Sequence, residues 1–157
     1  MGFFCFSSKM YIVMINLRHK FFKSFSVWLF FVFILNSLAN FFFWYSSIKQ
    51  FDMLMHFLGG FTASLFSFWF IYKKCILWIE SGNASKLFRV LLLMVIVIAL
   101  LWEIMEFLVQ DIFGVTVLAN IPDSMSDLLF GALGGVFGYL YLIRKYKKEK
   151  IKDPITI

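Results

Sequence analysis

Charged residues are scarce in this chain. Asp, Glu, Lys and Arg together make up 15% of its 157 residues, whereas soluble domains carry about 25%. Hydrophobic residues reach 62% and aromatic residues alone reach 22%, while roughly 45–50% apolar is ordinary for a soluble domain. The mean hydropathy is +0.86. This composition excludes an ordinary soluble domain and predicts an integral membrane protein that lies in the lipid bilayer.

Cysteine is also rare, and few residues lie outside the long apolar stretches. The two cysteines, Cys5 and Cys75, form no CxxC pair, which argues against a structural disulfide or a zinc site. A membrane-spanning helix needs roughly 20 apolar residues, and four such stretches leave no room for a large soluble domain. The sequence shows no Ser/Cys–His nucleophile arrangement and no phosphate-binding loop.

The apolar stretches predict an all-α protein, an integral membrane bundle of four transmembrane helices over residues 25–143. The predicted spans are about 26–45, 52–72, 90–110 and 123–143. Residues 1–24 mix aromatic and basic side chains, and their apolar run is short, which is typical of a membrane-surface segment. Residues 144–157 form a basic tail.

The basic residues gather on one side of this predicted topology. Four Lys and Arg residues precede the first span, four lie between the second and third spans, and six follow the fourth. Lys49 alone lies in a different loop. Because loops rich in Lys and Arg stay in the cytoplasm, both termini are predicted to be cytoplasmic. The net charge of +6 is then a matter of topology, and no nucleic-acid partner is predicted.

Two acids lie inside the third predicted span, at Glu103 and Glu106. A carboxylate in hydrocarbon costs about 2.5–3.5 kcal/mol on insertion scales, so such residues face a protein interior or a water-filled cavity. Residues three apart lie on one face of a helix, roughly 5–6 Å from each other. The pair therefore predicts a polar site between helices.

Other polar residues are predicted to lie at the same depth, on the outer side. Asp52 and His56 open the second span, and Asp123 and Asp127 open the fourth. At a helical rise of 1.5 Å per residue, His56 and Asp127 lie about 6 Å inward from those first aspartates. Asn40 lies in the outer half of the first span. The four helices are thus predicted to form one outward-facing polar pocket.

One imidazole with several carboxylates suits Mg²⁺, Mn²⁺ or Ca²⁺ better than structural zinc. A divalent cation is therefore the predicted cofactor, if the site has one. The predicted metal ligands are Asp52, His56, Glu103 and Asp127; the catalytic candidates are Glu106, as a base, and His56; the supporting residues are Asn40 and Asp123.

Simpler explanations exist for several of these residues. Asp123 directly follows Pro122 and suits a helix N-cap, and Asp52 has a similar position. A lone histidine is often a hydrogen-bonded core residue. On the fourth span, two interleaved GxxxG spacings predict close helix packing; their members are Gly131, Gly134, Gly135 and Gly138.

Three segments carry a family resemblance: DMLMHFLGG, WEIMEF and DSMSDLLFGALGG, in that order across roughly residues 50–140. They resemble small bacterial polytopic proteins of the VanZ-like and YjdF-like groups. The matching positions are Asp52, His56, Glu103, Asp123 and Asp127. The chain lacks the lysine after Asp52, has Glu106 as a second acid, and has Gly131 where asparagine is often found, which places it nearer the YjdF-like group. The resemblance implies a multi-pass protein of the bacterial plasma (inner) membrane, and it implies little about mechanism.

Three functions remain open. The first is a metal-dependent or acid–base enzyme acting on a lipid-linked or envelope substrate at the outer leaflet. The second is a small cation- or proton-coupled transporter or channel protomer, in which the acids bind or relay the ion. The cytoplasmic halves of the spans lack ionisable residues, so a through-path would need a homo-oligomer. The third is a non-catalytic membrane protein whose acids only join helices. The clustering at one depth argues against this third function, and the missing through-path places the enzyme ahead of the transporter.

Overall fold

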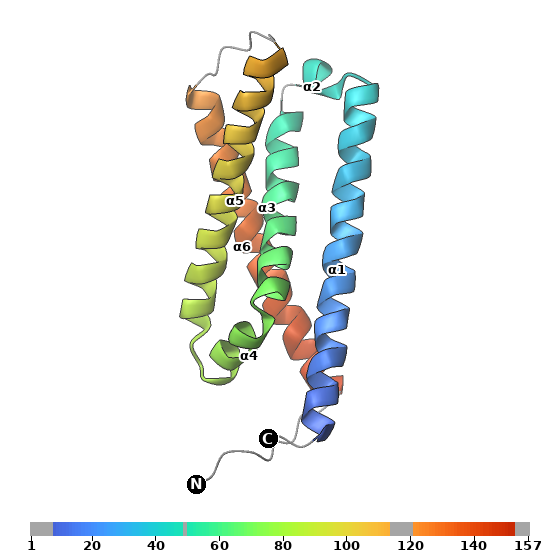
Figure 1. The fold of residues 1–157 in the computed structure, drawn as a ribbon, viewed down its shortest axis with the longest axis vertical. Helices are drawn as coiled ribbons and strands as arrows, with labels where there is room; N and C mark the ends of the chain where they lie inside the picture. Colours follow the sequence, from blue (N-terminus) through green and yellow to red (C-terminus); the bar gives the residue numbers. More distant parts are fainter. Residues whose placement is uncertain (1–7, 49, 114–120, 153–157) are drawn as a thin grey trace.

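The computed structural model describes residues 8–48, 50–113 and 121–152. These residues form α-helices without any strand, which confirms the predicted all-α class. The helices are α1 (Ser8–Phe41), α2 (Trp44–Ser47), α3 (Phe51–Phe70), α4 (Tyr72–Glu80), α5 (Ala84–Phe113) and α6 (Ile121–Lys152). Figure 1 shows α1, α3, α5 and α6 running along the long axis. The short helices lie toward opposite ends, which we call the α2 end and the α4 end.

Each long helix contains a stretch that is long and apolar enough to cross a membrane. These stretches are Ile15–Phe41, Phe51–Phe70, Ala84–Leu108 and Ser124–Ile151. Their number confirms the four predicted spans. Many large apolar side chains on the bundle surface are exposed, among them Phe30, Phe33 and Leu101, as expected for helices that contact lipid tails.

The first and last long helices extend beyond the predicted spans, 26–45 and 123–143. Residues 8–24 belong to α1, so the predicted surface segment and the first span are one continuous helix. Residues 144–152 likewise continue α6. Helical hydrogen bonds extend through polar residues as readily as apolar ones, so hydropathy locates a span better than it locates the ends of its helix. The positions of 8–24 and of the tail relative to the membrane stay predictions.

Glycines bring α3 and α6 into backbone contact. A Cβ added to Gly60 of α3 would overlap the carbonyl oxygen of Gly131 on α6, and a Cβ added to Gly134 would overlap the carbonyl oxygen of Phe57. Neither position has room for a larger residue unless the helices separate. The predicted packing role of the GxxxG spacings is therefore confirmed.

A different glycine face contacts α5. A Cβ added to Gly135 would lie 2.9 Å from Cγ1 of Val95 on α5. Because successive glycines of α6 point toward different neighbours, α6 packs closely against both α3 and α5. This contact between three helices fixes the relative positions of the side chains that lie one helical turn from it toward the α2 end.

The apolar core lies nearer the α4 end. It joins side chains from α1, α3, α4, α5 and α6: Leu17, Phe21, Leu65, Phe68, Tyr72, Cys75, Ile76, Leu87, Leu91, Leu142 and Tyr146. The rings of Phe21 and Phe68 are 4.8 Å apart between centroids. Burial raises the pKa of the Cys75 thiol to about 12, so this cysteine stays protonated.

A polar contact joins α4 to α6 at the edge of this core. Tyr146 Oη donates to Glu80 Oε1 at 2.5 Å, and Lys150 Nζ donates to both carboxylate oxygens of Glu80 at 2.9 and 2.7 Å. The hydrogen bonds from Lys150 and Tyr146 lower the pKa of Glu80. The contact is therefore strongest while Glu80 is ionised.

This contact predicts a small loss of stability in acid that depends on Glu80. A lowered pKa in the folded protein means that ionised Glu80 stabilises the fold above its ordinary value of 4.5, and that this stabilisation is lost as the pH falls below it. The effect is modest because Glu80 is partly exposed. Thermal unfolding in detergent at about pH 7 and about pH 3 should show a smaller acid shift for Glu80→Gln than for the wild type. Equal shifts in the two proteins would contradict this assignment.

Candidate functional site

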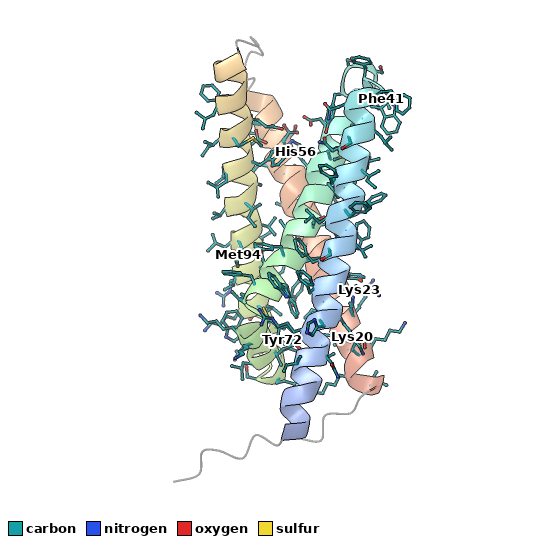
Figure 2. All side chains as sticks on the ribbon, turned by 45° about the vertical axis from the view of Figure 1, so that its right-hand side comes forward. Lys20, Lys23, Phe41, His56, Tyr72 and Met94 are labelled. Atoms are coloured by element: carbon teal, nitrogen blue, oxygen red, sulfur yellow. The ribbon has the colours of Figure 1, made fainter. Side chains whose placement is uncertain are left out.

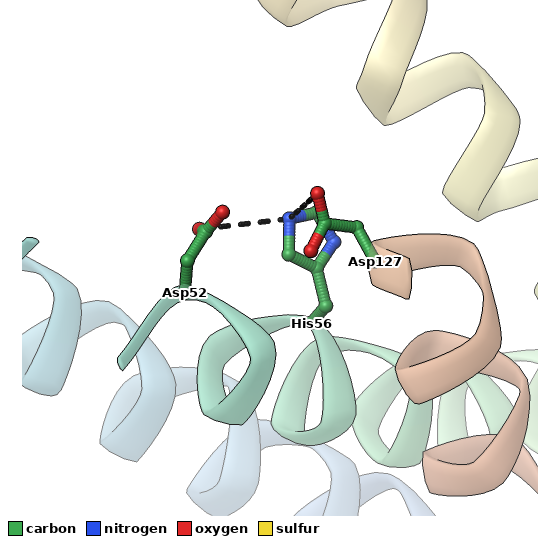
Figure 3. A group of neighbouring side chains, drawn as sticks. All are labelled: Asp52, His56 and Asp127. Atoms are coloured by element: carbon green, nitrogen blue, oxygen red, sulfur yellow. Dashed lines mark ion pairs between the residues drawn. The ribbon is translucent and has the colours of Figure 1, made fainter. Parts of the chain in front are cut away.

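Three helices place carboxylates around the imidazole of His56. His56 Nε2 lies 3.6 Å from Oδ1 of Asp52, one turn earlier on α3, and 3.9 Å from Oδ2 of Asp127 on α6. Its other nitrogen, Nδ1, lies 3.7 Å from Oε1 of Glu103 on α5. Figure 3 shows the ring between Asp52 and Asp127, with both acids directed at the same nitrogen. The structure thus brings together the four residues that the sequence proposed as metal ligands.

The glycine contact explains why His56 and Asp127 meet. Gly60 follows His56 by four residues, and Gly131 follows Asp127 by four, so each glycine lies on the same helix face as its polar partner. Since the Gly60 and Gly131 backbones touch, the two side chains one turn toward the α2 end are held side by side.

Gly131 also positions α5. A Cβ added to Gly131 would lie 3.7 Å from Cβ of Ala99, and Glu103 follows Ala99 by one helical turn. Gly131, which contacts α3 at Gly60, thus also contacts α5 one turn before Glu103, on the face from which Glu103 is directed toward His56. Small residues on three helices set the geometry of the polar cluster above them.

Burial differs across the cluster. The side chains of His56 and Asp127 are 9% and 7% exposed, and that of Glu103 is 19% exposed. The side chain of Asp52 is 43% exposed. A ligand would therefore reach the buried imidazole from the Asp52 side.

The separations between these groups suit a shared cation better than direct hydrogen bonds. A separation of 3.6 Å or more is too long for a hydrogen bond. Two ligand atoms that are each about 2.1 Å from one ion lie roughly 3–4.2 Å apart. Two groups of three residues could hold an ion, because in each group one ligand atom per residue lies within 4.8 Å of the other two. The first group is Asp52, His56 and Asp127, and the second is His56, Glu103 and Glu106. The ring can thus serve a cation site on either side.

Glu103 has an unsatisfied oxygen. Its Oε1 is fully buried and accepts no hydrogen bond from the described residues. A buried acceptor without a partner costs about 1–3 kcal/mol, and more when it is charged. A proton on His56 Nδ1 or a bound cation would offset this cost.

Glu106 is held by a residue that the sequence did not single out. Trp102 Nε1, one turn earlier on α5, donates to Glu106 Oε1 at 2.8 Å. The carboxylate is half-buried. Glu106 therefore has a fixed orientation near the cluster, and its role as a base stays a prediction.

Tyr45 is a second residue missed by the sequence. Phe43 has a left-handed backbone conformation, with φ 56°, which is uncommon for a side chain of this size and reverses the chain after α1. Tyr45 then donates to Asn36 Oδ1 at 2.6 Å. Burial and the negative charges of Asp52 and Glu106 raise the pKa of Tyr45. Hydropathy gives no signal for this, because it cannot show which way the chain turns after a span.

The two supporting residues lie elsewhere or outside what the structure describes. Asn40 is exposed, and its Nδ2 donates to the backbone oxygen of Asn36 at 2.8 Å, so its described hydrogen bonds lie within α1. Asp123 lies in the first turn of α6, and its side chain is outside the described residues. Support from either residue stays a prediction.

A family model for predicted membrane proteins, DUF2238, matches residues 3–148. The chain belongs to the DUF2238 family. A protein of Thermotoga maritima, named as uncharacterized, is 32% identical over 104 residues, which cover 66% of this chain and 53% of that relative. The chain thus spans about half the length of the curated relative it matches. No solved structure matches the sequence.

The DUF2238 match includes every residue of the cluster, from Asp52 to Asp127. Together with the four apolar helices, it identifies the chain as a membrane protein. The family description names no activity, so the function has to be inferred from the cluster itself.

Proposed function

We propose that this DUF2238 protein binds one divalent cation between Asp52, His56 and Asp127. The observation that supports the proposal most is that two carboxylates from different helices face the same imidazole nitrogen, at 3.6 and 3.9 Å. Carboxylate oxygens favour Mg²⁺, Mn²⁺ or Ca²⁺, and a single imidazole is best accommodated by Mn²⁺.

Glu103 has a different role in this proposal from the one the sequence suggested. It faces the nitrogen opposite to Asp52 and Asp127. Histidines that bind a metal through one nitrogen usually donate the other N–H to a carboxylate, which fixes the ring. In this proposal the 3.7 Å separation shortens when the ion binds, so that Glu103 accepts the Nδ1–H as a positioning residue. The ion would neutralise the carboxylates on the far side of the ring.

The activity we propose is that of an enzyme acting on a lipid-linked or envelope substrate. Asp52 is the exposed member of the cluster, so a substrate approaches there, and the oriented carboxylate of Glu106 is the candidate base. A bound cation would polarise a substrate oxygen or lower the pKa of a bound water. All these groups come from one chain, so the proposed site needs no homo-oligomer.

The arrangement of charge supports an outer-leaflet position in a bacterial plasma membrane. Figure 2 shows Lys20 and Lys23 in the half of the bundle away from His56. Basic residues flanking membrane spans favour the cytoplasmic side, which would put His56 near the outer surface. This placement is part of the proposal. So is the assignment of the chain to the YjdF-like group rather than the VanZ-like group.

The proposal is tested by metal binding to the purified protein in detergent. After loading with Mn²⁺ and desalting, we expect about one ion per wild-type chain by mass spectrometry. His56→Ala should lose the ion, whereas His19→Ala should retain it, because His19 is an exposed histidine far along α1 from the cluster. If the wild type binds no Mn²⁺, Mg²⁺ or Ca²⁺, or if His56→Ala binds like the wild type, the proposal is wrong.

A cation- or proton-coupled transporter is the alternative, and one observation favours it. The hydroxyls of Ser64 and Ser67 on α3 and of Tyr72 on α4 are buried and form no hydrogen bond within the described part of the chain. They continue from the level of the cluster toward the α4 end, where water or an ion would satisfy them. Accumulation of Mn²⁺ inside proteoliposomes would identify a transporter, whereas binding without accumulation favours the enzyme.

A further inference from the structure

A groove lies between α1 and α6 at the α4 end, far from His56. Its volume is about 480 Å³, and its charged lining residues are Lys20, Lys23, Lys145 and Glu149. A second hollow of about 350 Å³ shares Lys145 and Glu149 and adds Arg144 and Lys148. Figure 2 shows Lys20 at the level of Tyr72, the first residue of α4, with Lys23 nearer the middle of the bundle. The two hollows together form a basic surface that the candidate metal site does not use.

The groove carries excess positive charge. Its one acid, Glu149, is bound by Lys20 Nζ at 2.5 Å. No ion pair within the described residues engages Lys23, Arg144, Lys145 or Lys148. Four cations around a neutralised carboxylate predict an anionic ligand.

Lys145 is held in place rather than extended into solvent. Its Nζ lies 5.5 Å from the ring centre of Phe21 and 5.6 Å from that of Tyr141, and it donates to the backbone oxygen of Lys20 at 3.4 Å. Aromatic rings attract such a cation through their faces. The ammonium group is therefore partly desolvated and positioned before any ligand binds.

Toward the middle of the bundle the groove becomes apolar. Trp28 and Tyr141 both pack on Phe61 of α3: the ring centroid of Phe61 lies 4.7 Å from that of Trp28 and 5.7 Å from that of Tyr141. Val27, next to Trp28 in the sequence, is exposed. Ser24 Oγ and Tyr141 Oη share a hydrogen bond of 3.0 Å between the basic and the apolar parts. The lining of the groove thus changes from cationic to aromatic toward the middle of the bundle. Such a lining suits a ligand with a charged head and an apolar tail.

We propose that this groove binds an anionic phospholipid. Its phosphate would lie among Lys23, Lys145 and the α6 cations, and an acyl chain would lie along Val27 and Trp28. Both walls belong to helices long and apolar enough to span a membrane, so a lipid can enter sideways from the bilayer. Basic pockets between transmembrane helices are known to hold lipid phosphates. The inference does not depend on the proposed metal site.

The test uses the full chain in detergent with phosphatidylglycerol, phosphatidylcholine and inorganic phosphate as separate ligands, and native mass spectrometry as the readout. We expect the wild type to retain phosphatidylglycerol in preference to phosphatidylcholine. Each basic residue near a lipid surface contributes about fivefold in binding, so Lys23→Gln/Lys145→Gln should weaken phosphatidylglycerol binding about 25-fold. Lys73→Gln/Lys74→Gln, which removes the same charge from exposed positions on α4, should leave it unchanged.

Because Lys145 packs on two aromatic rings, replacing it could disturb the fold, and a second variant serves as the control. Lys23→Gln/Arg144→Gln changes only exposed positions and should weaken binding similarly. The proposal is overturned if both groove variants retain phosphatidylglycerol like the wild type, or if the α4 variant weakens it equally. Equal retention of phosphatidylcholine would also overturn it. If millimolar inorganic phosphate displaces the lipid completely, the groove is a site for free phosphate and the lipid assignment is wrong.

Discussion

Gly60→Ala should strongly destabilise the fold. The new Cβ would overlap the carbonyl oxygen of Gly131, and a backbone atom cannot rotate away as a side chain can. Overpacking of this kind costs about 1–3 kcal/mol and sometimes more, and we expect the upper end. The helices must separate, so His56 and Asp127 should move apart and Mn²⁺ binding should fall with stability. Thermal unfolding in detergent and metal content measure the two effects.

The neighbouring glycine provides the control. A Cβ added to Gly59 meets no atom within 4 Å, and alanine is a better helix former than glycine by about 1 kcal/mol in soluble helices. Gly59→Ala should therefore unfold at the wild-type temperature or above it, and it should bind Mn²⁺ normally. Equal stability of the two variants would show that α3 and α6 do not touch at Gly60.

Asp127→Asn should lose more Mn²⁺ affinity than Glu103→Gln, although both changes remove one carboxylate from the same imidazole. Asp127 faces the nitrogen proposed to bind the ion, whereas Glu103 faces the other nitrogen. Loss of a carboxylate that only orients a histidine ligand costs roughly 10–100-fold in metal affinity. We expect the loss of affinity in Glu103→Gln to fall within that range and the loss in Asp127→Asn to exceed it. Both substitutions keep the shape of the side chain, so packing at the glycine contact is preserved.

Titration of each variant with Mn²⁺, followed by electron paramagnetic resonance, separates free from bound ion and gives the affinities directly. If Glu103→Gln loses as much affinity as Asp127→Asn, then Glu103 is a ligand, as the sequence suggested, and the ion lies on the Nδ1 side of the ring. If neither change weakens binding, the ion is not held by this cluster.

Much of the fold was accessible from the sequence because a bilayer leaves few choices for an apolar stretch. The four spans follow from length and hydropathy. The ends of the helices do not, because the backbone of α1 and α6 stays helical through their basic segments. The separate helix α4 lies between the second and third predicted spans, where hydropathy predicts no span, and the chain turns after it at Gly82, with φ +73°.

The site could be predicted as a group of residues but not as an arrangement. Depth along each helix follows from a constant rise per residue, which was enough to collect Asp52, His56, Glu103 and Asp127. Which nitrogen faces which acid depends on how each helix is rotated about its axis, and the small residues at the contact set that rotation. The basic groove was hidden for a similar reason. Lys20 and Glu149 are 129 residues apart in sequence, and counting lysines for topology says nothing about which of them become neighbours.

The order of the helices has a consequence for biosynthesis. His56 lies on α3, whereas Asp127 lies on α6, which is translated after it. While α3 enters the membrane, the strip of α3 around Gly60 has no partner, and it remains without one until α6 has been translated and inserted. The nascent chain therefore carries His56 through the insertion of α3 without Asp127, and an ion held by both residues can bind only after α6 has been made. Loss of the residues after 120 should leave a chain with three apolar helices for quality-control proteases to recognise.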